Sequence, residues 1–373
     1  MTGALQRSNM KTHKSLNSIR IIAMLACLSL SCGACFPAKP IKVFNRGSKE
    51  EVCSLAFSPD GQVLAVGSSA PSTRTGLDPS ERPLPEGTIE LYDLRTARLS
   101  ATLRQSAWHK RSDLSDELNR VCSISFSPDG KWMVGSDMIG YSLWDLAARK
   151  EKFSWHARVS DQDLSVGWSR DSRRLALPSL DLENEQSEHG AAVIEVATGK
   201  RTAFFPVEIG YARSAQISPD GKLLATAGHD CVVKVFDLAT QTNIFSDSVQ
   251  VTMFAACFSP NGRYLVAGPS WGGVLLIYEI TSEGGRIKVN KKGQSSPGGG
   301  ASYLEFTPDG KRAFSKTYGA VALWDATSWA APKQLLNCRG RLSTDGTRVA
   351  LVRDQSHGII ELWDINDLSK TMQ

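Results

Sequence analysis

Two short motifs in this chain have the residue types of a catalytic loop or a phosphate-binding loop. The segment Gly268–Gly272 reads G-P-S-W-G and matches the G-x-S-x-G pattern that presents a nucleophilic serine between a strand and a helix. Here it falls between two predicted strands, so we expect no nucleophile. Gly199 and Lys200 are similar to the end of a phosphate-binding loop, but Ile194 and Arg201 stand where that loop requires Gly and Ser or Thr. We interpret this pair as a turn.

The histidines and cysteines do not have the spacing of a metal site either. The six histidines are His13, His109, His156, His189, His229 and His357. Five of the eight cysteines fall on separate predicted strands: Cys53, Cys122, Cys231, Cys257 and Cys338. Such separation favours small buried apolar side chains over disulfide partners. The sequence therefore predicts no metal site, no cofactor and no catalytic centre.

The first 35 residues differ in composition from the rest of the chain. Residues 1–20 are polar and basic, Ile21–Leu30 is nearly all apolar, and small residues and cysteines follow in Ser31–Cys35. The apolar run is shorter than the ~20 residues of a membrane-spanning helix. These are the parts of a secretory signal, so we expect residues 1–35 to be a signal peptide and the protein to be exported.

Two fates of this signal stay open. The segment loosely resembles a bacterial lipoprotein signal, in which a cysteine is acylated after cleavage. Cys32 or Cys35 would be that residue, although Ser29 and Cys32 occupy the positions where an aliphatic residue is preferred. The protein would then be tethered to a membrane through an N-terminal lipid. With plain cleavage it would be periplasmic or secreted.

The charge of the chain gives no sign of nucleic-acid binding. The formal net charge is +5, and four basic residues in the first 35 account for most of it, because that segment contains no acid. The remaining body is nearly neutral. We therefore expect no nucleic-acid partner.

A strand–turn–strand phrase recurs seven times after this segment. Its turn reads S-P-D-G or a variant: Ser58–Gly61, Ser127–Gly130, Ser169–Ser172, Ser218–Gly221, Ser259–Gly262, Thr307–Gly310 and Ser343–Gly346. Pro presets φ, the Asp side chain bonds the backbone, and Gly adopts the positive φ that closes the turn. Each copy is followed by a second strand, which ends in an aromatic–acid pair such as Trp144-Asp145 or Trp363-Asp364 in every repeat but the third, where Ile194-Glu195 stands. Each repeat is therefore expected to be a small antiparallel sheet.

Seven ordered pairs of these phrases resemble the WD40-repeat family over residues 40–368. The resemblance implies an all-β fold, a seven-bladed β-propeller over residues 40–373, preceded by the signal segment. Propellers of the TolB type share the S-P-D-G turns and stay open as an alternative. The third repeat lacks Pro-Asp-Gly and Trp-Asp, so we expect it to depend on packing more than on side-chain networks. In this family the first strand commonly completes the last blade, and Ile41–Asn45 has the required alternation.

The long connections are all predicted on one face of the ring. If each blade runs a–b–c–d from the centre outward, the a–b and c–d turns share one face, and the b–c and d–a loops share the other. The four insertions are all of the second kind: Ser69–Gly87, Ser106–Asn119, Ser179–Gly190 and Lys291–Gly300. Neutral drift of surface loops would populate both faces, so we favour this face as a binding surface.

Within that face we select Trp108, His109 and Trp271 as candidate partner-binding residues, because exposed aromatic residues are common at binding hot spots. These rings could equally pack under their own loops. Seven blades and a signal leave no residues for a catalytic domain. We therefore predict a non-enzymatic, exported scaffold that binds a protein or peptide. The alternative is an exported propeller enzyme or small-ligand-binding protein that uses the central channel, and it requires polar residues with perturbed pKa values there.

Overall fold

The computed structural model divides the chain into two units, Met1–Ala38 and Lys39–Gln373, and only the second is described below. Cys32 and Cys35 lie outside the described residues. The described residues are 39–46, 51–69, 87–104, 120–137, 140–157, 164–181, 189–207, 209–269, 273–295, 300–316, 321–330, 332–336, 339–354 and 358–367. They are almost entirely strands and turns, with a single helical turn at residues 365–367.

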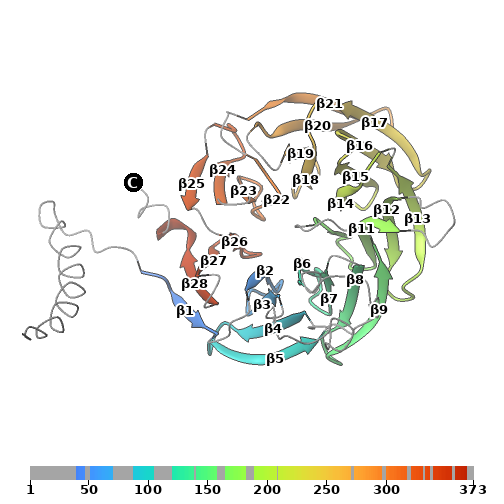
Figure 1. Cartoon of the computed structure of the whole chain (residues 1–373). Coiled ribbons are helices and arrows are strands. Elements are labelled where there is room, and N and C mark those ends of the chain that lie inside the picture. Colours follow the sequence, from blue (N-terminus) through green and yellow to red (C-terminus); the bar gives the residue numbers. More distant parts are fainter. Residues whose placement is uncertain are drawn as a thin grey trace, which may run out of the picture. The chain divides into compact units, whose positions relative to one another are not determined.

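The unit Lys39–Gln373 consists of seven four-stranded antiparallel sheets arranged as the blades of a ring (Figure 1). The innermost strands are β2 (Val52–Phe57), β6 (Ser123–Phe126), β10 (Gly167–Trp168), β14 (Ala212–Ile217), β18 (Met253–Phe258), β22 (Tyr303–Phe306) and β26 (Arg339–Leu342). The second strands are β3 (Val63–Ser68), β7 (Trp132–Ser136), β11 (Arg174–Asp181), β15 (Leu223–Gly228), β19 (Tyr264–Pro269), β23 (Arg312–Lys316) and β27 (Arg348–Asp354). The predicted all-β, seven-bladed propeller is confirmed.

The outer half of each blade follows the same order. The third strands are β4 (Thr88–Asp93), β8 (Gly140–Asp145), β12 (His189–Glu195), β16 (Val232–Asp237), β20 (Leu276–Glu283), β24 (Val321–Asp325) and β28 (Ile359–Asp364). The outermost strands are β5 (Arg98–Arg104), β9 (Lys150–His156), β13 (Arg201–Pro206), β17 (Thr242–Ser248), β21 (Arg286–Gln294), β25 (Lys333–Leu336) and β1 (Lys42–Asn45).

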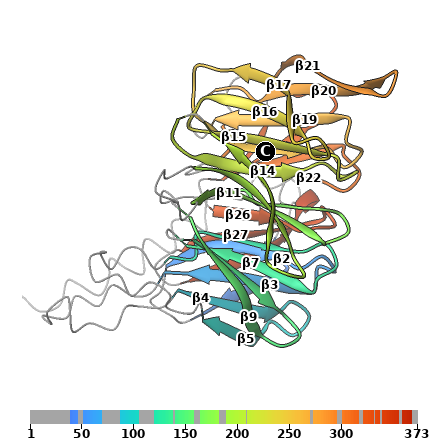
Figure 2. The same cartoon turned by 90° about the vertical axis from the view of Figure 1, so that its right-hand side faces the viewer.

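The strands run along the ring axis, as the side view shows (Figure 2). Because neighbouring strands are antiparallel, the turns after each first and third strand lie on one face. We call this the short-turn face. The connections after each second and fourth strand lie on the opposite face, which we call the loop-rich face. The four inserted segments identified in the sequence fall in connections of the loop-rich face, and most of their residues are outside the described ranges. The bounds of two were too wide: Lys291–Gln294 belong to β21, and the ends of Ser179–Gly190 belong to β11 and β12.

The last blade is completed by the first strand of the chain. β1 pairs antiparallel with β28, with Lys42 opposite Leu362 and Asn45 opposite Ile359. Its side chains also reach the first blade: the Phe44 ring lies 5.7 Å from that of Tyr92, edge to face. This closure matches the expectation for Ile41–Asn45, and it leaves no unpaired sheet edge between the first and last blades.

The side chains of the repeated turn form a small clamp in every blade. In the first, the Ser58 hydroxyl donates to Asp60 Oδ1 at 2.5 Å and accepts from the Val63 amide at 2.9 Å. The hydroxyl bonds the turn Asp or Asn in the other six blades, at Ser127, Ser169, Ser218, Ser259, Thr307 and Ser343. The turn glycines adopt positive φ, such as +64° at Gly61.

The third blade corrects an expectation. Its turn lacks Pro and Gly, yet the Ser169 hydroxyl donates to Asp171 Oδ1 at 2.6 Å, and Ser172 adopts the φ of +60° that Gly supplies elsewhere. Glu195 stands where five of the other blades have Asp and accepts from the Thr198 hydroxyl at 2.6 Å. The expectation that this blade has less side-chain bonding than the others is therefore wrong at its turns, where the bonds are kept. One hydroxyl and one carboxylate are enough to form the clamp.

The core lies between neighbouring blades. The aromatic residue of each aromatic–acid pair is buried there, with Trp324 fully buried and its Nε1 donating to Ser315 Oγ at 2.9 Å. The Asp that follows accepts backbone amides of the next turn, as Asp93 does from Arg95 and Thr96 at 2.8 Å. Within the described ranges the cysteines form no disulfides: Cys53 and Cys122 are buried, and Cys231 and Cys257 are partly buried.

Candidate interaction face and axial channel

The candidate residues Trp108, His109 and Trp271 lie outside the described residues, so they stay predictions. The described part of the loop-rich face contains exposed apolar residues instead. Ile209, in the connection between β13 and β14, is 74% exposed, and Val251, in the connection between β17 and β18, is 51% exposed. The four other exposed large apolar residues among the described ones are on outermost strands or next to β1: Ile41, Val43, Leu99 and Ile244. Among the described residues, Ile209 and Val251 are therefore the exposed large apolar residues that belong to the loop-rich face.

Beside Ile209 and Val251 the loop-rich face contains a row of aromatic rings. Tyr211 lies 6.1 Å from His229, and His229 lies 6.0 Å from Phe254, measured between ring centroids. These residues begin or end strands of the fourth and fifth blades, so the fold places their rings at the edge of the face. His189, at the start of β12, extends the row, with its ring 5.2 Å from that of Tyr211.

A buried arginine holds this row together. Arg213, in β14, is only 4% exposed, and its Nε donates to His229 Nε2 at 2.9 Å. Its guanidinium lies 4.5 Å from the centroid of the Phe254 ring, which is a favourable cation–π distance. Burial and the Arg213 charge both lower the pKa of His229 below its ordinary value of 6.5. The row therefore combines a buried positive charge with a neutral imidazole.

Two connected pockets lie along the ring axis, and we call them together the axial channel. The wider one has a volume of about 430 Å³ and is lined by residues from all seven blades. It includes turn residues Pro59, Pro128 and Thr344, so it reaches the short-turn face. The narrower pocket, of about 20 Å³, lies towards the other end and includes Val52, Lys316 and Val352. Four residues line both pockets: Ser123, Ile124, Tyr303 and Arg341.

Titratable groups gather on one side of this channel. Arg341 Nε lies 3.5 Å from Glu305 Oε2, and its guanidinium lies 3.7 Å from the centroid of the Tyr303 ring. The Tyr303 hydroxyl donates to Glu305 Oε2 at 3.0 Å. Burial raises the pKa of Glu305 despite the opposing charge of Arg341. Burial, with the nearby Glu305 charge, raises the pKa of the Cys257 thiol to about 12.

These channel residues were missed in the sequence. Glu305 and Arg341 stand on the innermost strands of neighbouring blades, and each looks like an ordinary polar residue beside a buried strand. Aligning the seven repeats on their turns could have identified these two residues. At the position of Glu305, two residues before the turn Thr or Ser, the other repeats have Ala56, Ser125, Gln216, Cys257 and Arg341, and Gly167 in the third. A charge at an inward position in only two neighbouring repeats marks the site.

Among the described residues there is no group of three or more His, Cys, Asp or Glu side chains placed to hold a metal ion. They also include no helix long and apolar enough to cross a membrane.

Four segments of the chain match the model of the WD40 family (WD domain, G-beta repeat): residues 38–70, 111–139, 209–237 and 242–279. An uncharacterised WD repeat-containing protein of Deinococcus radiodurans is 25% identical over 279 residues, which cover 73% of this chain and 88% of that protein. The small ribosomal subunit protein RACK1 of Brassica napus is 29% identical over 130 residues, 31% of this chain and 39% of that protein.

A solved structure shares the fold. The β-propeller domain of Cps50 (Swd1) from Myceliophteria thermophila superposes with a TM-score of 0.63 at 13% sequence identity, covering 88% of this chain and all of that domain. The chain spans only 24% and 39% of the lengths of the first curated relatives that it matches. These matches therefore do not assign the activities or partners of those longer proteins to this chain.

Proposed function

We propose that this chain, which belongs to the WD40-repeat family of β-propellers, is a non-catalytic scaffold whose loop-rich face holds a protein or peptide partner. WD40 propellers typically bind proteins, and a relative of this chain is by name a component of the small ribosomal subunit. One observation carries the choice of face. Ile209 and Val251 are exposed on the same face as the four insertions identified in the sequence, whereas the described turns of the short-turn face are short except for the extended β20–β21 hairpin.

The chemistry of this face suits a partner with apolar or aromatic side chains. Burying Ile209 and Val251 against a partner would remove their apolar surface from water, which is the main favourable term in association. Tyr211 and His229 beside them are partly buried; Arg213 bonds His229, and the His229 ring contacts that of Tyr211, so little side-chain freedom is lost on binding. The short-turn face offers mainly turns whose polar groups are already bonded within each clamp.

A capture experiment with paired variants tests this proposal. The chain is used to capture partners from extract of its own source, and capture is repeated with the Ser69–Gly87 loop shortened and with Ile209→Asp plus Val251→Asp. Both exposed positions tolerate a charge in the folded monomer. The control, Lys222→Ala plus Lys311→Ala, changes exposed residues of the short-turn face.

We expect the loop-rich variants to lose the partners that the control retains. Equal capture by all variants would contradict the choice of face.

Export is a separate part of the proposal and depends on residues 1–35 alone. The basic, apolar and small-residue order of that segment supports it. Mass spectrometry of the protein from its source tests it, with Cys32→Ser and Cys35→Ser compared. Loss of the first 31 or 34 residues together with the mass of added acyl chains supports a lipid anchor. An intact N-terminus would contradict export by this signal.

A second candidate function is binding of a small ligand in the axial channel. A channel lined only by backbone and by small or apolar side chains would have argued against it. Lys316, Arg341 and Glu305 all line the channel, and that observation favours it.

A further inference from the structure

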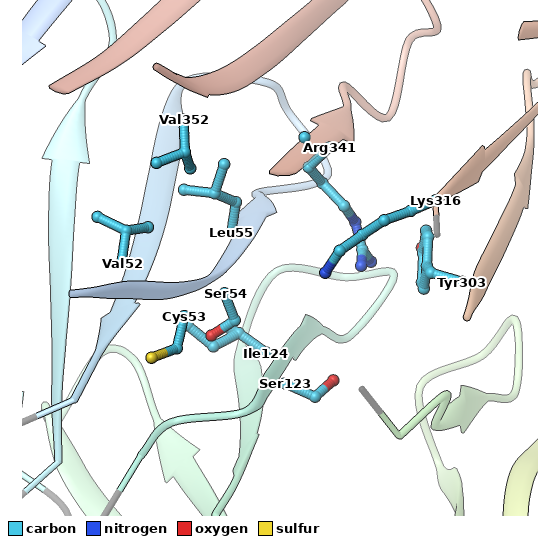
Figure 3. A pocket seen from close by; sticks show the side chains of 11 residues that line it. Val52, Cys53, Ser54, Leu55, Ser123, Ile124, Tyr303, Lys316, Arg341 and Val352 are labelled. Carbon is cyan, nitrogen blue, oxygen red and sulfur yellow. The ribbon is translucent and has the colours of Figure 1, made fainter. Parts of the chain in front are cut away.

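The axial channel contains two cationic side chains that approach one point. Lys316, the last residue of β23, and Arg341, on β26, both line the narrower pocket of about 20 Å³. In the close view their nitrogen-bearing ends converge from two different blades (Figure 3). Groups of like charge that share so small a space repel one another, and an anion between them would turn that repulsion into attraction.

The described residues of the channel lining have a net charge of the same sign. Among the described residues that line either pocket, the charged side chains are Lys316, Arg341 and Glu305. Two cations and one carboxyl group leave the lining positive, more so whenever Glu305 is protonated. Burial raises the pKa of Glu305 and so favours its protonated form. The pocket walls are protein rather than water, so this charge is less screened than on the surface.

The two pockets differ in size in a way that suits a ligand with a small charged group and a larger apolar part. The narrower pocket has room for little more than a small polar group. The wider pocket, of about 430 Å³, is within the size range of small-molecule sites and adjoins it at Tyr303 and Arg341. The aromatic residues Phe57, Phe126 and Trp168 are among those that line it. The one pocket therefore fits a charged group, and the other fits an apolar or aromatic remainder.

We propose that the axial channel binds a small organic carboxylate, with the carboxylate held by Arg341 and Lys316 and the apolar body against Trp168 and Tyr303. The planar guanidinium can donate two parallel hydrogen bonds to a carboxylate, and the lysine adds a third donor. This inference rests on the second candidate function. It can be tested separately from the scaffold proposal, because Lys316 and Arg341 line the channel and differ from the exposed residues Ile209 and Val251.

Calorimetric titration with three probes tests the inference. Phenylacetate has an aromatic body and a carboxylate, phenylacetamide has the same body without charge, and inorganic phosphate has charge without the body. We expect phenylacetate to bind at least about tenfold more tightly than either of the other two, because each charge-assisted hydrogen bond is worth a factor of roughly ten or more. Quenching of Trp168 fluorescence should accompany binding and be absent in Trp168→Phe.

Variants of the channel locate the binding. Lys316→Met keeps the length of the side chain and should weaken phenylacetate binding by about ten- to a hundredfold, whereas Lys316→Arg should retain it. Should Lys316→Met fail to fold, the paired change Arg341→Met with Glu305→Leu removes both members of the buried ion pair together and should weaken binding likewise. The Ile209→Asp/Val251→Asp variant should bind phenylacetate unchanged.

Three outcomes would overturn the inference. If phenylacetamide binds as tightly as phenylacetate, the channel binds small ligands but does not recognise charge. If none of the probes binds, the result contradicts both the inference and the second candidate function. If phenylacetate binding survives in Lys316→Met and in the paired variant, the carboxylate is held elsewhere. None of these results affects the scaffold proposal, which is tested on the opposite face.

Discussion

His229 and Arg213 show how one hydrogen bond fixes the protonation of a side chain. Arg213 Nε can donate to His229 Nε2 only if that nitrogen has no proton, so the imidazole is neutral with its proton on Nδ1. Burial and the Arg213 charge lower the pKa of His229 for the same reason. The ring is thus held as a neutral, oriented surface on the loop-rich face.

The lowered pKa of His229 predicts a pH dependence of stability. The unfolded chain takes up this proton near pH 6.5, before the folded protein does, so the free energy of unfolding should fall as the pH drops below 6.5 and level off beyond the folded pKa. Denaturant unfolding at pH 7.5 and 5.5, compared with His229→Gln, isolates this contribution. Titration by NMR should place the pKa of His229 below 6.5. A value at or above 6.5 would contradict the hydrogen bond from Arg213.

At the scale of the element, the repeated turn depends on one hydroxyl and one carboxylate or amide oxygen. The clamp persists in the third blade without Pro or Gly, because Ser169 and Asp171 are retained. Pro and Gly lower the cost of the turn conformation, whereas the hydroxyl and the Asp supply its hydrogen bonds. Loss of the first two therefore leaves the turn in place.

Removing the clamp hydroxyl tests this division of roles. Ser169→Ala and Ser127→Ala each leave a strand amide, that of Arg174 or Trp132, without its side-chain acceptor. We expect both to lower the free energy of unfolding by a similar amount, about 1–2 kcal/mol. Denaturant unfolding measures the two differences. A clear cost for Ser127→Ala with none for Ser169→Ala would mean that the third blade depends on packing after all.

The elements and their order could be predicted from the sequence, because each repeat contains its own turn and strand-end residues. Ser58–Gly61 forms a turn and Trp144-Asp145 ends a strand, and both depend on residues that are close in the sequence. The channel site could not be predicted in this way. Glu305 and Arg341 meet only because neighbouring blades place their innermost strands side by side, and Ile209 looks like any apolar residue in a short connection. Contacts between blades are set by the closed ring.

At the scale of the whole molecule, ring closure depends on a four-residue strand. β1 pairs with β28 of the last blade, and its side chains also bond the first blade. From β1, Lys42 Nζ donates to the carbonyl oxygens of Leu94 and Arg95. Arg46, the residue directly after β1, donates from Nε to Glu90 Oε2 at 2.6 Å. Since the Arg46 side chain has no exposed surface and that of Glu90 is 16% exposed, this ion pair is largely shielded from water.

Two neighbouring residues of β1 provide a matched test of closure. Phe44 is 3% exposed and packs between the last and first blades, whereas Val43 is 53% exposed. Phe44→Ala should lower the free energy of unfolding by about 3–5 kcal/mol, and Val43→Ala should change it by less than about 0.5 kcal/mol. Denaturant unfolding compares them. Similar effects of the two changes would mean that β1 does not hold the ring closed.

The central claim is that a partner is held on the loop-rich face, and site-specific photo-crosslinking tests it most directly. A photoreactive residue is placed in turn at Ile209 and Val251 on that face, and at Lys131 and Lys311 on the short-turn face. After irradiation in source extract, the crosslinked species are identified by mass. We predict one shared partner crosslinked from Ile209 and Val251 and not from the two lysine positions. Crosslinks of the same partner chiefly from Lys131 and Lys311 would contradict the claim.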